Sequence, residues 1–311
     1  MPKNKSLVYQ VNKTLESKMR FGESKHTAKQ QKDIHGRAHS YEGIYSYNTH
    51  KAYLVKCCAF AKWAKEHYGC RTLEQARKYV DNYIQDRIDR GYAPSTQKTI
   101  SNALAKLYGF TSKDFIQTQP RRRVDITRSR QGKAKARFSE SRNKEFVDFC
   151  KSTGLRRHEI ENLRAENIRY DESTGQYMIT NLKGKGGRIR ECPILSNLSK
   201  ETVKSILNTP HGQKVWSKVP ANADIHSYRA DYCAAIYERY ARPVDEISKQ
   251  NRYYCRKDLK GVVYDKRAMA VASRVLGHSR IGVIAVNYLH NVARKQLEGV
   301  SGNKNARSIA P

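Results

Sequence analysis

The stretch Ser152-Thr-Gly-Leu-Arg-Arg-His-Glu-Ile-Glu-Asn-Leu163 decides how the second half of this chain is read. Gly154 is suited to end the helix that the preceding apolar residues predict, and Ile160 lies on the inward face of the next one. Arg156 then falls at a helix start, where backbone N–H groups favour an anion. Glu159 lies one turn further on, close enough to brace the guanidinium. Standing alone, the pair would be an ordinary surface ion pair.

Downstream, residues 177–180 and 192–195 form two short apolar runs of β type. Between them lies the glycine-rich basic stretch Lys183-Gly-Lys-Gly-Gly-Arg-Ile-Arg190. This pattern predicts a hairpin whose tip carries Lys185, able to reach a bound duplex. Lys183 and Arg188 flank the tip as candidate DNA contacts. The simpler interpretation is a basic hairpin that only touches phosphate.

Further along, four polar residues lie in short contexts of their own. His226 and Arg229 are about one helical turn apart in Asp224-Ile-His-Ser-Tyr-Arg229, so they point the same way on a helix. His278 follows a glycine break in Val275-Leu-Gly-His278, and Tyr288 comes ten residues later. Taken singly, each has a plainer interpretation, such as a capped helix start or a packed tyrosine.

The first half of the chain predicts three amphipathic helices in a small bundle. Apolar residues recur at helical spacing from Tyr53 to Ala64, and Gly69 ends that run. Thr72 with Gln75 forms a capping box that opens a second helix, expected to continue to Gly91. A third helix is expected after Pro94 and runs through residue 107.

The segments around this bundle are basic and poor in apolar periodicity. Residues 1–40 predict a basic arm or loosely docked helix, residues 41–111 the helical domain, 112–137 a basic linker, and 138–311 the second domain with a C-terminal tail. A flexible basic linker would lie along a phosphate backbone. Its candidate DNA contacts are Arg121, Arg122, Arg123, Arg128, Arg130, Lys133, Lys135 and Arg137.

Composition favours a polyanionic partner. In the 311 residues, 60 Lys and Arg against 29 Asp and Glu leave a formal charge of +31, which points first to nucleic acid and then to an anionic membrane surface. No apolar run approaches the roughly 20 residues of a membrane-spanning helix, and no signal-peptide pattern is present, so we expect a cytosolic protein. The seven cysteines lack the spacing of a metal site, and we expect them to be small buried hydrophobic residues in a reducing compartment.

In their order, the boxes Thr-Gly-Leu-Arg156 with Glu159, Gly-Lys185-Gly, His226-x-x-Arg229, Leu-Gly-His278 and Tyr288 resemble the tyrosine recombinase (phage integrase) family of mobile elements. The resemblance covers about residues 41–300. It implies a mainly α fold with a small β-sheet or hairpin. The helical core-binding domain would be followed by a mixed α/β catalytic domain.

The resemblance also implies a chemistry for each box. Arg156 and Arg229 would hold the scissile phosphate, Tyr288 would attack it to form a 3′-phosphotyrosine, and Lys185 would protonate the departing 5′-oxygen. His226 would assist proton transfer and His278 would donate to the phosphate, with Glu159 in support. Neither metal nor ATP is required, because the covalent link conserves the phosphodiester energy.

As partners the resemblance implies a double-stranded DNA recombination site, a homo-tetramer on DNA, and accessory proteins that bend DNA or set direction. Two intervals depart from the family pattern. The one between Arg229 and His278 is long, with an insertion at 241–266, and Tyr288 lies one residue later than expected. Two alternatives stay open, namely a type IB-like topoisomerase and a catalytically inactive DNA-binding protein of the same fold.

Overall fold

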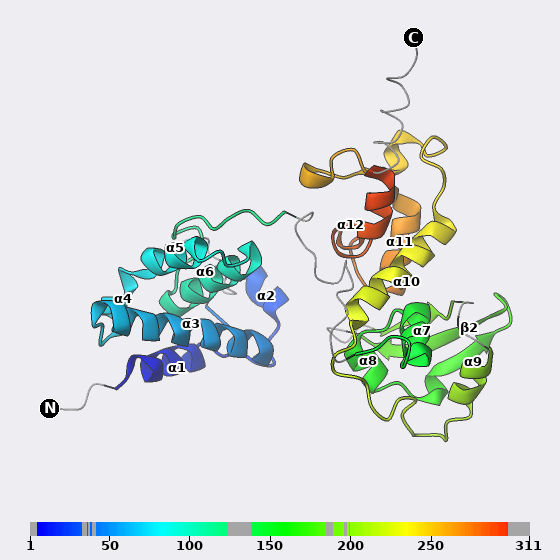
Figure 1. Cartoon of the computed structure of the whole chain (residues 1–311), viewed down its shortest axis with the longest axis horizontal. Helices are drawn as coiled ribbons and strands as arrows, with labels where there is room; N and C mark the ends of the chain where they lie inside the picture. The colour runs from blue at the N-terminus through cyan, green and yellow to red at the C-terminus, as the bar shows by residue number, and fades with distance from the viewer. Residues whose placement is uncertain are drawn as a thin grey trace, which may run out of the picture. The chain divides into compact units, whose positions relative to one another are not determined.

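The computed structural model describes residues 5–32, 36, 38, 42–122, 138–184, 189–195, 198 and 200–297. The chain divides into two compact units, Met1–Arg121 and Arg122–Pro311, each with buried clusters of its own. Within each unit, Figure 1 shows how the helices and strands are arranged. Of the predicted basic linker, residues 123–137 lie outside the described residues, as does the hairpin tip at 185–188.

The regular elements described in unit 1 are helices. Its helices are α1 (Leu7–Ser17), α2 (Lys25–Gln30), α3 (Tyr47–Tyr68), α4 (Leu73–Arg77), α5 (Val80–Asp89) and α6 (Pro94–Tyr108). The predicted signals at the helix ends are confirmed. Gly69 ends α3 with a left-handed conformation, Thr72 and Gln75 form the capping box of α4, and Pro94 occupies the first turn of α6.

The second predicted helix is interrupted at residues 78–79, between α4 and α5. At the break, the ring of Tyr79 stacks on that of Tyr68 from α3, with centroids 3.6 Å apart. Ala76, Val80 and Ile84 keep their four-residue spacing through it and remain buried. Packing on α3 therefore preserves the apolar face of the predicted helix while dividing its backbone.

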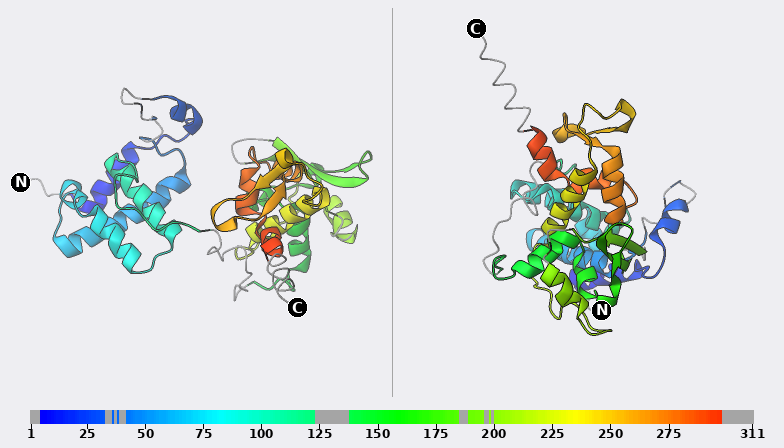
Figure 2. Two further views of the ribbon diagram at one scale, coloured as in Figure 1. Left: turned by 90° about the horizontal axis from the view of Figure 1, so that it is seen from above. Right: turned by 90° about the vertical axis from the view of Figure 1, so that its right-hand side faces the viewer.

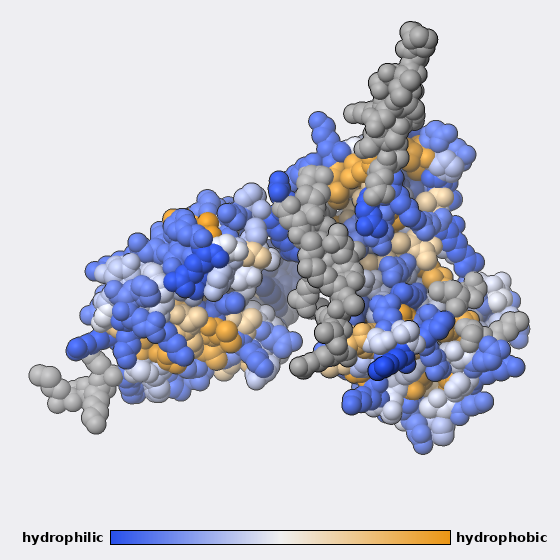
Figure 3. All heavy atoms as spheres, viewed as in Figure 1, coloured by the Kyte–Doolittle hydropathy of each residue, from blue (hydrophilic) through white to orange (hydrophobic). Residues whose placement is uncertain are grey.

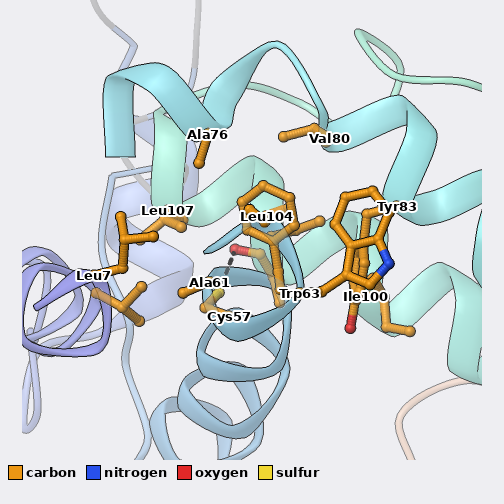
Figure 4. Packing of buried hydrophobic residues seen from close by; sticks show 14 of the residues in the cluster. Leu7, Cys57, Ala61, Trp63, Ala76, Val80, Tyr83, Ile100, Leu104 and Leu107 are labelled. Atoms are coloured by element: carbon orange, nitrogen blue, oxygen red, sulfur yellow. Dashed lines mark hydrogen bonds between the residues drawn. The ribbon is translucent and has the colours of Figure 1, made fainter. Parts of the chain in front are cut away.

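Residues 1–40 were expected to form a basic arm or a loosely docked helix, and the structure has a docked helix, α1, in this segment. Leu7, Val11 and Leu15 of α1 are at most 4% exposed and belong to the core of unit 1. Their spacing places them on one helical face, which packs against α3. Figure 4 shows Leu7 beside Ala61 and Leu107, with the thiol of Cys57 donating to the carbonyl of Ala103. Three apolar residues are enough to dock α1, because α3 and α6 provide the apolar surface that they pack against.

The start of the predicted linker also belongs to unit 1. Phe115 and Ile116 pack against its core, and the Ile116 N–H donates to Asp81 at 2.9 Å. Gln97, which is fully buried in α6, exchanges hydrogen bonds with Gln119. Residues 112–119 therefore extend the bundle.

Unit 2 combines helices with two small antiparallel sheets. Its labelled helices are α7 (Lys144–Thr153), α8 (Arg157–Glu161), α9 (Lys200–Leu207), α10 (Ile225–Tyr240), α11 (Lys266–Val275) and α12 (Gly282–Asn287), with short 3-10 turns at Ala165–Asn167, Lys249–Asn251 and Lys257–Leu259. Residues 290–297 form a further helical segment at the end of the described chain. The first sheet pairs β1 (Ile168–Asp171), β2 (Gln176–Lys183) and β3 (Ile189–Pro193) in that order. The second pairs β4 (Arg252–Tyr254) with β5 (Val263–Asp265).

The strands β2 and β3 pair as the predicted hairpin. β1, which was not predicted from the sequence, pairs with β2 as a third strand. The predicted 241–266 insertion contains the β4–β5 hairpin. The predicted mainly α fold class with small sheets is confirmed. All seven cysteines are free thiols, and five of them are buried.

Figure 3 shows hydrophilic residues over most of the visible face of each unit, in keeping with the charge of +31. Among the described helices, none has both the length and the apolar character to cross a membrane.

Candidate active site

The C-terminus of α11 is where the candidate site assembles. The last carbonyls of a helix have no partner within it, and they carry the negative end of the helix dipole. Three arginines from distant segments donate to them. Arg190 donates to Val275 at 2.6 Å, and Arg229 and Arg156 share the carbonyl of Leu276 at 2.6 and 3.3 Å. The site is thus organised around one helix end.

Arg156 reaches this point from the turn between α7 and α8. Gly154 ends α7 at a φ of +58°, and a Cβ there would lie 2.2 Å from the ring of Tyr232 on α10. Glu159 accepts from the backbone N–H of Arg156 at 2.7 Å and from its guanidinium at 2.9 Å. The predicted bracing of Arg156 by Glu159 is therefore present as two hydrogen bonds.

Glu159 is a buried carboxylate, 5% exposed, with a second arginine partner. Arg190, on β3, donates to it at 2.7 Å. Burial alone would raise the pKa of Glu159, but the charge of Arg190, the Arg156 N–H and the charges of Arg229 and Arg156 together lower it. Three guanidinium groups around one carboxylate leave an excess of positive charge for an anion.

Arg190 was not among the site residues predicted from the sequence, although it lies in the predicted hairpin. Alternation along β3 buries Arg190 and Cys192 and leaves Ile189 71% exposed, the reverse of what hydrophobicity alone predicts. The neighbouring Gly277, at a φ of +69°, allows this approach, because a Cβ there would lie 2.7 Å from Cδ of Arg190. Arg190 lies two residues before Cys192 on the strand, so the two side chains share one face, and this spacing could have predicted that Arg190 points inward.

Arg229 is the most enclosed of the three arginines, at 1% exposure in α10. Besides Leu276, it donates to the carbonyl of Gly154 and, through Nε, to the Tyr288 hydroxyl at 3.4 Å. Burial lowers the pKa of its guanidinium, but an arginine remains protonated at neutral pH. Arg229 therefore joins the α7–α8 turn, the α11 end and the tyrosine.

Tyr288 follows α12 directly and is 5% exposed. Its hydroxyl lies 3.3 Å from Nε2 of His278 as well as 3.4 Å from Arg229. The ring of His226, an exposed residue in the first turn of α10, is centred 5.3 Å from the tyrosine ring. Although Tyr288 lies one residue later after His278 than expected, the structure places it beside the two histidines and Arg229.

His278 is half-buried beside these charges. Burial, followed by the charges of Arg229, Arg156 and Arg190, lowers its pKa to about 4. At neutral pH the ring is therefore uncharged, with one N–H and one lone pair.

The other tyrosines near the insertion lie elsewhere. Tyr264 is fully buried and donates to the carbonyl of Leu289 at 3.0 Å, while Tyr254 is 54% exposed on β4. Of Tyr254, Tyr264 and Tyr288, only Tyr288 has its hydroxyl within hydrogen-bond distance of Arg229 and His278 in the described part of the chain.

The structure places the remaining predicted residues only in part. Arg121 and Arg122 are exposed at the boundary of the two units, and Lys183 is exposed at the end of β2. The others lie outside the described residues, namely Lys185, Arg188, Arg123, Arg128, Arg130, Lys133, Lys135 and Arg137.

No protein-family model and no curated protein matches the sequence. Solved structures do match. XerH site-specific recombinase, in a post-cleavage complex with palindromic difH substrate, aligns over 95% of each chain with a TM-score of 0.51 and 12% identity. The Tn1549 transposon integrase, with transposon right end DNA, aligns over 96% of this chain and 100% of its own, with a TM-score of 0.48 and 10% identity. The likeness to XerH shows that the two chains share a fold.

Proposed function

We propose that this chain, which has the fold of the XerH recombinase, is a tyrosine site-specific recombinase that cuts and rejoins DNA through a 3′-phosphotyrosine. One observation carries the proposal. The Tyr288 hydroxyl lies between Nε of Arg229 and Nε2 of His278, at 3.4 and 3.3 Å, and Arg229 shares a carbonyl with Arg156. A nucleophile, two phosphate-binding cations and a histidine that can donate to the phosphate thus converge within one unit.

In this reaction Arg156 and Arg229 bind the non-bridging oxygens of the scissile phosphate. Phosphate enters from the side where Arg156 is 28% exposed and His226 is exposed. The tyrosine oxygen forms a bond to phosphorus as the bond to the 5′-oxygen breaks. The excess positive charge of the site stabilises the additional negative charge of the transition state, where charge-assisted hydrogen bonds are strongest.

Two proton transfers accompany the exchange of bonds. The phenolic proton leaves Tyr288 with the help of His226, and His278 donates to the phosphate in its neutral form. Lys185, which falls between β2 and β3 in the sequence, protonates the departing 5′-oxygen. Rejoining reverses these steps when a 5′-hydroxyl of the partner strand attacks the phosphotyrosine, so no external energy source enters.

Exchange between two duplexes requires four strand cleavages, which is the reason to expect a homo-tetramer on DNA. The XerH site-specific recombinase is bound to a palindromic difH substrate in its structure, which favours a double-stranded recombination site as the substrate here. Integration or excision of a mobile element is the outcome that we propose for the reaction. Accessory proteins that bend DNA or set direction, and a location at the nucleoid in the cytoplasm, belong to the same proposal.

The test is covalent capture on nicked duplexes, in which the short 5′-hydroxyl fragment diffuses away and leaves the protein attached. Wild-type protein should form an adduct that survives denaturing electrophoresis. Tyr288→Phe should form none while binding DNA with unchanged affinity, because only a hydroxyl is lost. Tyr254→Phe, on exposed β4, is the matched control and should react normally. An adduct undiminished by Tyr288→Phe would overturn the nucleophile assignment.

A second assay separates the remaining alternatives. Recombination between two defined sites on one plasmid supports the recombinase. Relaxation of a supercoiled plasmid that lacks any such site supports the topoisomerase. DNA binding with neither reaction and no adduct indicates an inactive binding protein.

A further inference from the structure

Residues 241–266 lie between the Arg229 and His278 boxes and have no part in the chemistry above. The segment is nevertheless closed at its base, where Arg242 donates to Asp265 through Nε at 2.8 Å and Nη2 at 3.0 Å. Asp265 is fully buried and also accepts from the N–H of Arg267 at 2.8 Å, which caps α11. The insertion is therefore held firmly to the helix whose far end organises the site.

The insertion also holds the chain that follows Tyr288. The Tyr264 hydroxyl donates to the carbonyl of Leu289 at 3.0 Å, in a buried position one residue beyond the nucleophile. The side-chain amide of Gln296 accepts from the N–H of Val263 at 3.1 Å and donates to its carbonyl at 2.9 Å. Gln296 thereby fills the hydrogen-bonding edge of β5 as another strand would.

Apolar packing joins the same two segments. Leu259, Val262 and Tyr264 of the insertion share one buried cluster with Leu289 and Val292. Both views of Figure 2 place the gold β4–β5 hairpin near the red end of the described chain. Residues 290–297 are helical, and Val292 is buried in the same cluster.

We infer that Tyr264 and Gln296 are positioning residues that hold Tyr288 in its own active site. The inference rests on the proposed function, since it assigns the nucleophile's support. Tyr288 directly follows α12, which has only six residues and is too short to be stable alone. Bonds to Leu289 and Gln296 fix the chain on the other side of the tyrosine. The insertion thus supplies rigidity that the short helix lacks.

The experiment compares Tyr264→Phe and Gln296→Ala with two controls, Tyr254→Phe on the same hairpin and Lys295→Ala beside Gln296. Single-turnover cleavage of a nicked duplex should slow about fivefold for Tyr264→Phe, which loses one hydrogen bond, and more than that for Gln296→Ala, which loses two. The DNA dissociation constant should stay unchanged for both. The controls should match wild type. A folding defect would lower the reacting fraction, whereas a positioning defect lowers the rate constant at full amplitude.

Hydrogen exchange tests the brace without relying on activity. Amides of residues 289–297 should exchange faster in both brace variants, while those of α10 keep wild-type rates. Unchanged exchange and an unchanged cleavage rate would overturn the brace and leave the recombinase proposal intact. If wild-type protein forms no adduct on any duplex, the proposed function fails, and the exchange data still decide whether the insertion holds this segment.

Discussion

Arg190 is the residue whose environment most constrains the site. Its side chain is 5% exposed and joins Glu159 to the carbonyl of Val275, so it links the residue that braces Arg156 to the helix end that precedes His278. A buried charge is tolerated only when its partners are present. The geometry of the arginine cluster therefore depends on a residue that need not touch DNA.

Replacing Arg190 with Gln leaves the Glu159 carboxylate buried without its strongest partner. We expect a loss of about 3 kcal/mol in the free energy of unfolding, measured by urea denaturation. Arg169→Gln is the matched control, because Arg169 pairs with Glu191 on the same sheet at 3.4 Å with both side chains about half exposed. That change should cost less than about 0.5 kcal/mol. Equal losses for the two variants would contradict the assigned role.

His278 predicts a pH dependence of stability. Its pKa falls from 6.5 to about 4 on folding. Between pH 4 and 6.5 the His278 side chain is therefore protonated in the unfolded chain and neutral in the folded chain. The free energy of unfolding should therefore decrease as pH falls from 6.5 towards 4. Urea midpoints measured across this range should fall less steeply in His278→Gln. An NMR titration showing His278 protonated at pH 6 would refute the prediction.

At the scale of elements, the α7–α8 turn and the C-terminus of α11 act as a pair. The turn offers the carbonyl of Gly154 to Arg229 and presents Arg156, while the helix end offers the carbonyl of Leu276 to both arginines. α10 packs on both α7 and α11 and carries Arg229 between them. The relative placement of these helices sets the distance between the two phosphate-binding groups.

Gly154→Ala should disrupt this arrangement. The added Cβ meets the Tyr232 ring at 2.2 Å, and the residue must keep a φ of +58°. We expect a loss of about 3 kcal/mol, the sum of backbone strain and overpacking. Gly175→Ala has a similar φ of +65° but no atom nearer than 3.9 Å, so it should cost about 1 kcal/mol. Thermal unfolding of the two variants compares these effects, and similar shifts would argue against the packing contribution.

For the whole molecule, the separate cores of the two units are the main feature. Unit 1 buries its own cluster from Leu7 to Leu107, and unit 2 buries two clusters that include the site. A domain needs its own core to fold alone, and unit 1 has the size of many that do.

Residues 1–121 expressed alone should therefore unfold cooperatively on heating, with helical circular dichroism. A matched fragment beginning at residue 19 lacks α1 and its three buried side chains, so it should lose several kcal/mol of stability or fail to fold. Equal stability of the two fragments would show that α1 contributes nothing to the stability of unit 1 and contradict this prediction.

Local patterns in the sequence determined much of this protein. Gly69, Thr72 and Pro94 specified helix ends through backbone conformations and capping bonds that need no distant partner. The polar boxes of the sequence include Arg229 and His278, and both residues lie within hydrogen-bond distance of the Tyr288 hydroxyl in the structure.

Only the tertiary structure decided where α1 docks, why Arg190 is buried while Ile189 is exposed, and what the insertion holds. These features depend on partners far away in the chain. In the chain, α9 and α10 lie between Arg190 and its partner Val275. Likewise, α11 and α12 lie between Val263 and its partner Gln296. A short sequence pattern reports the preferences of its own backbone, but a buried charge or a docked face is stabilised only by groups that folding brings to it.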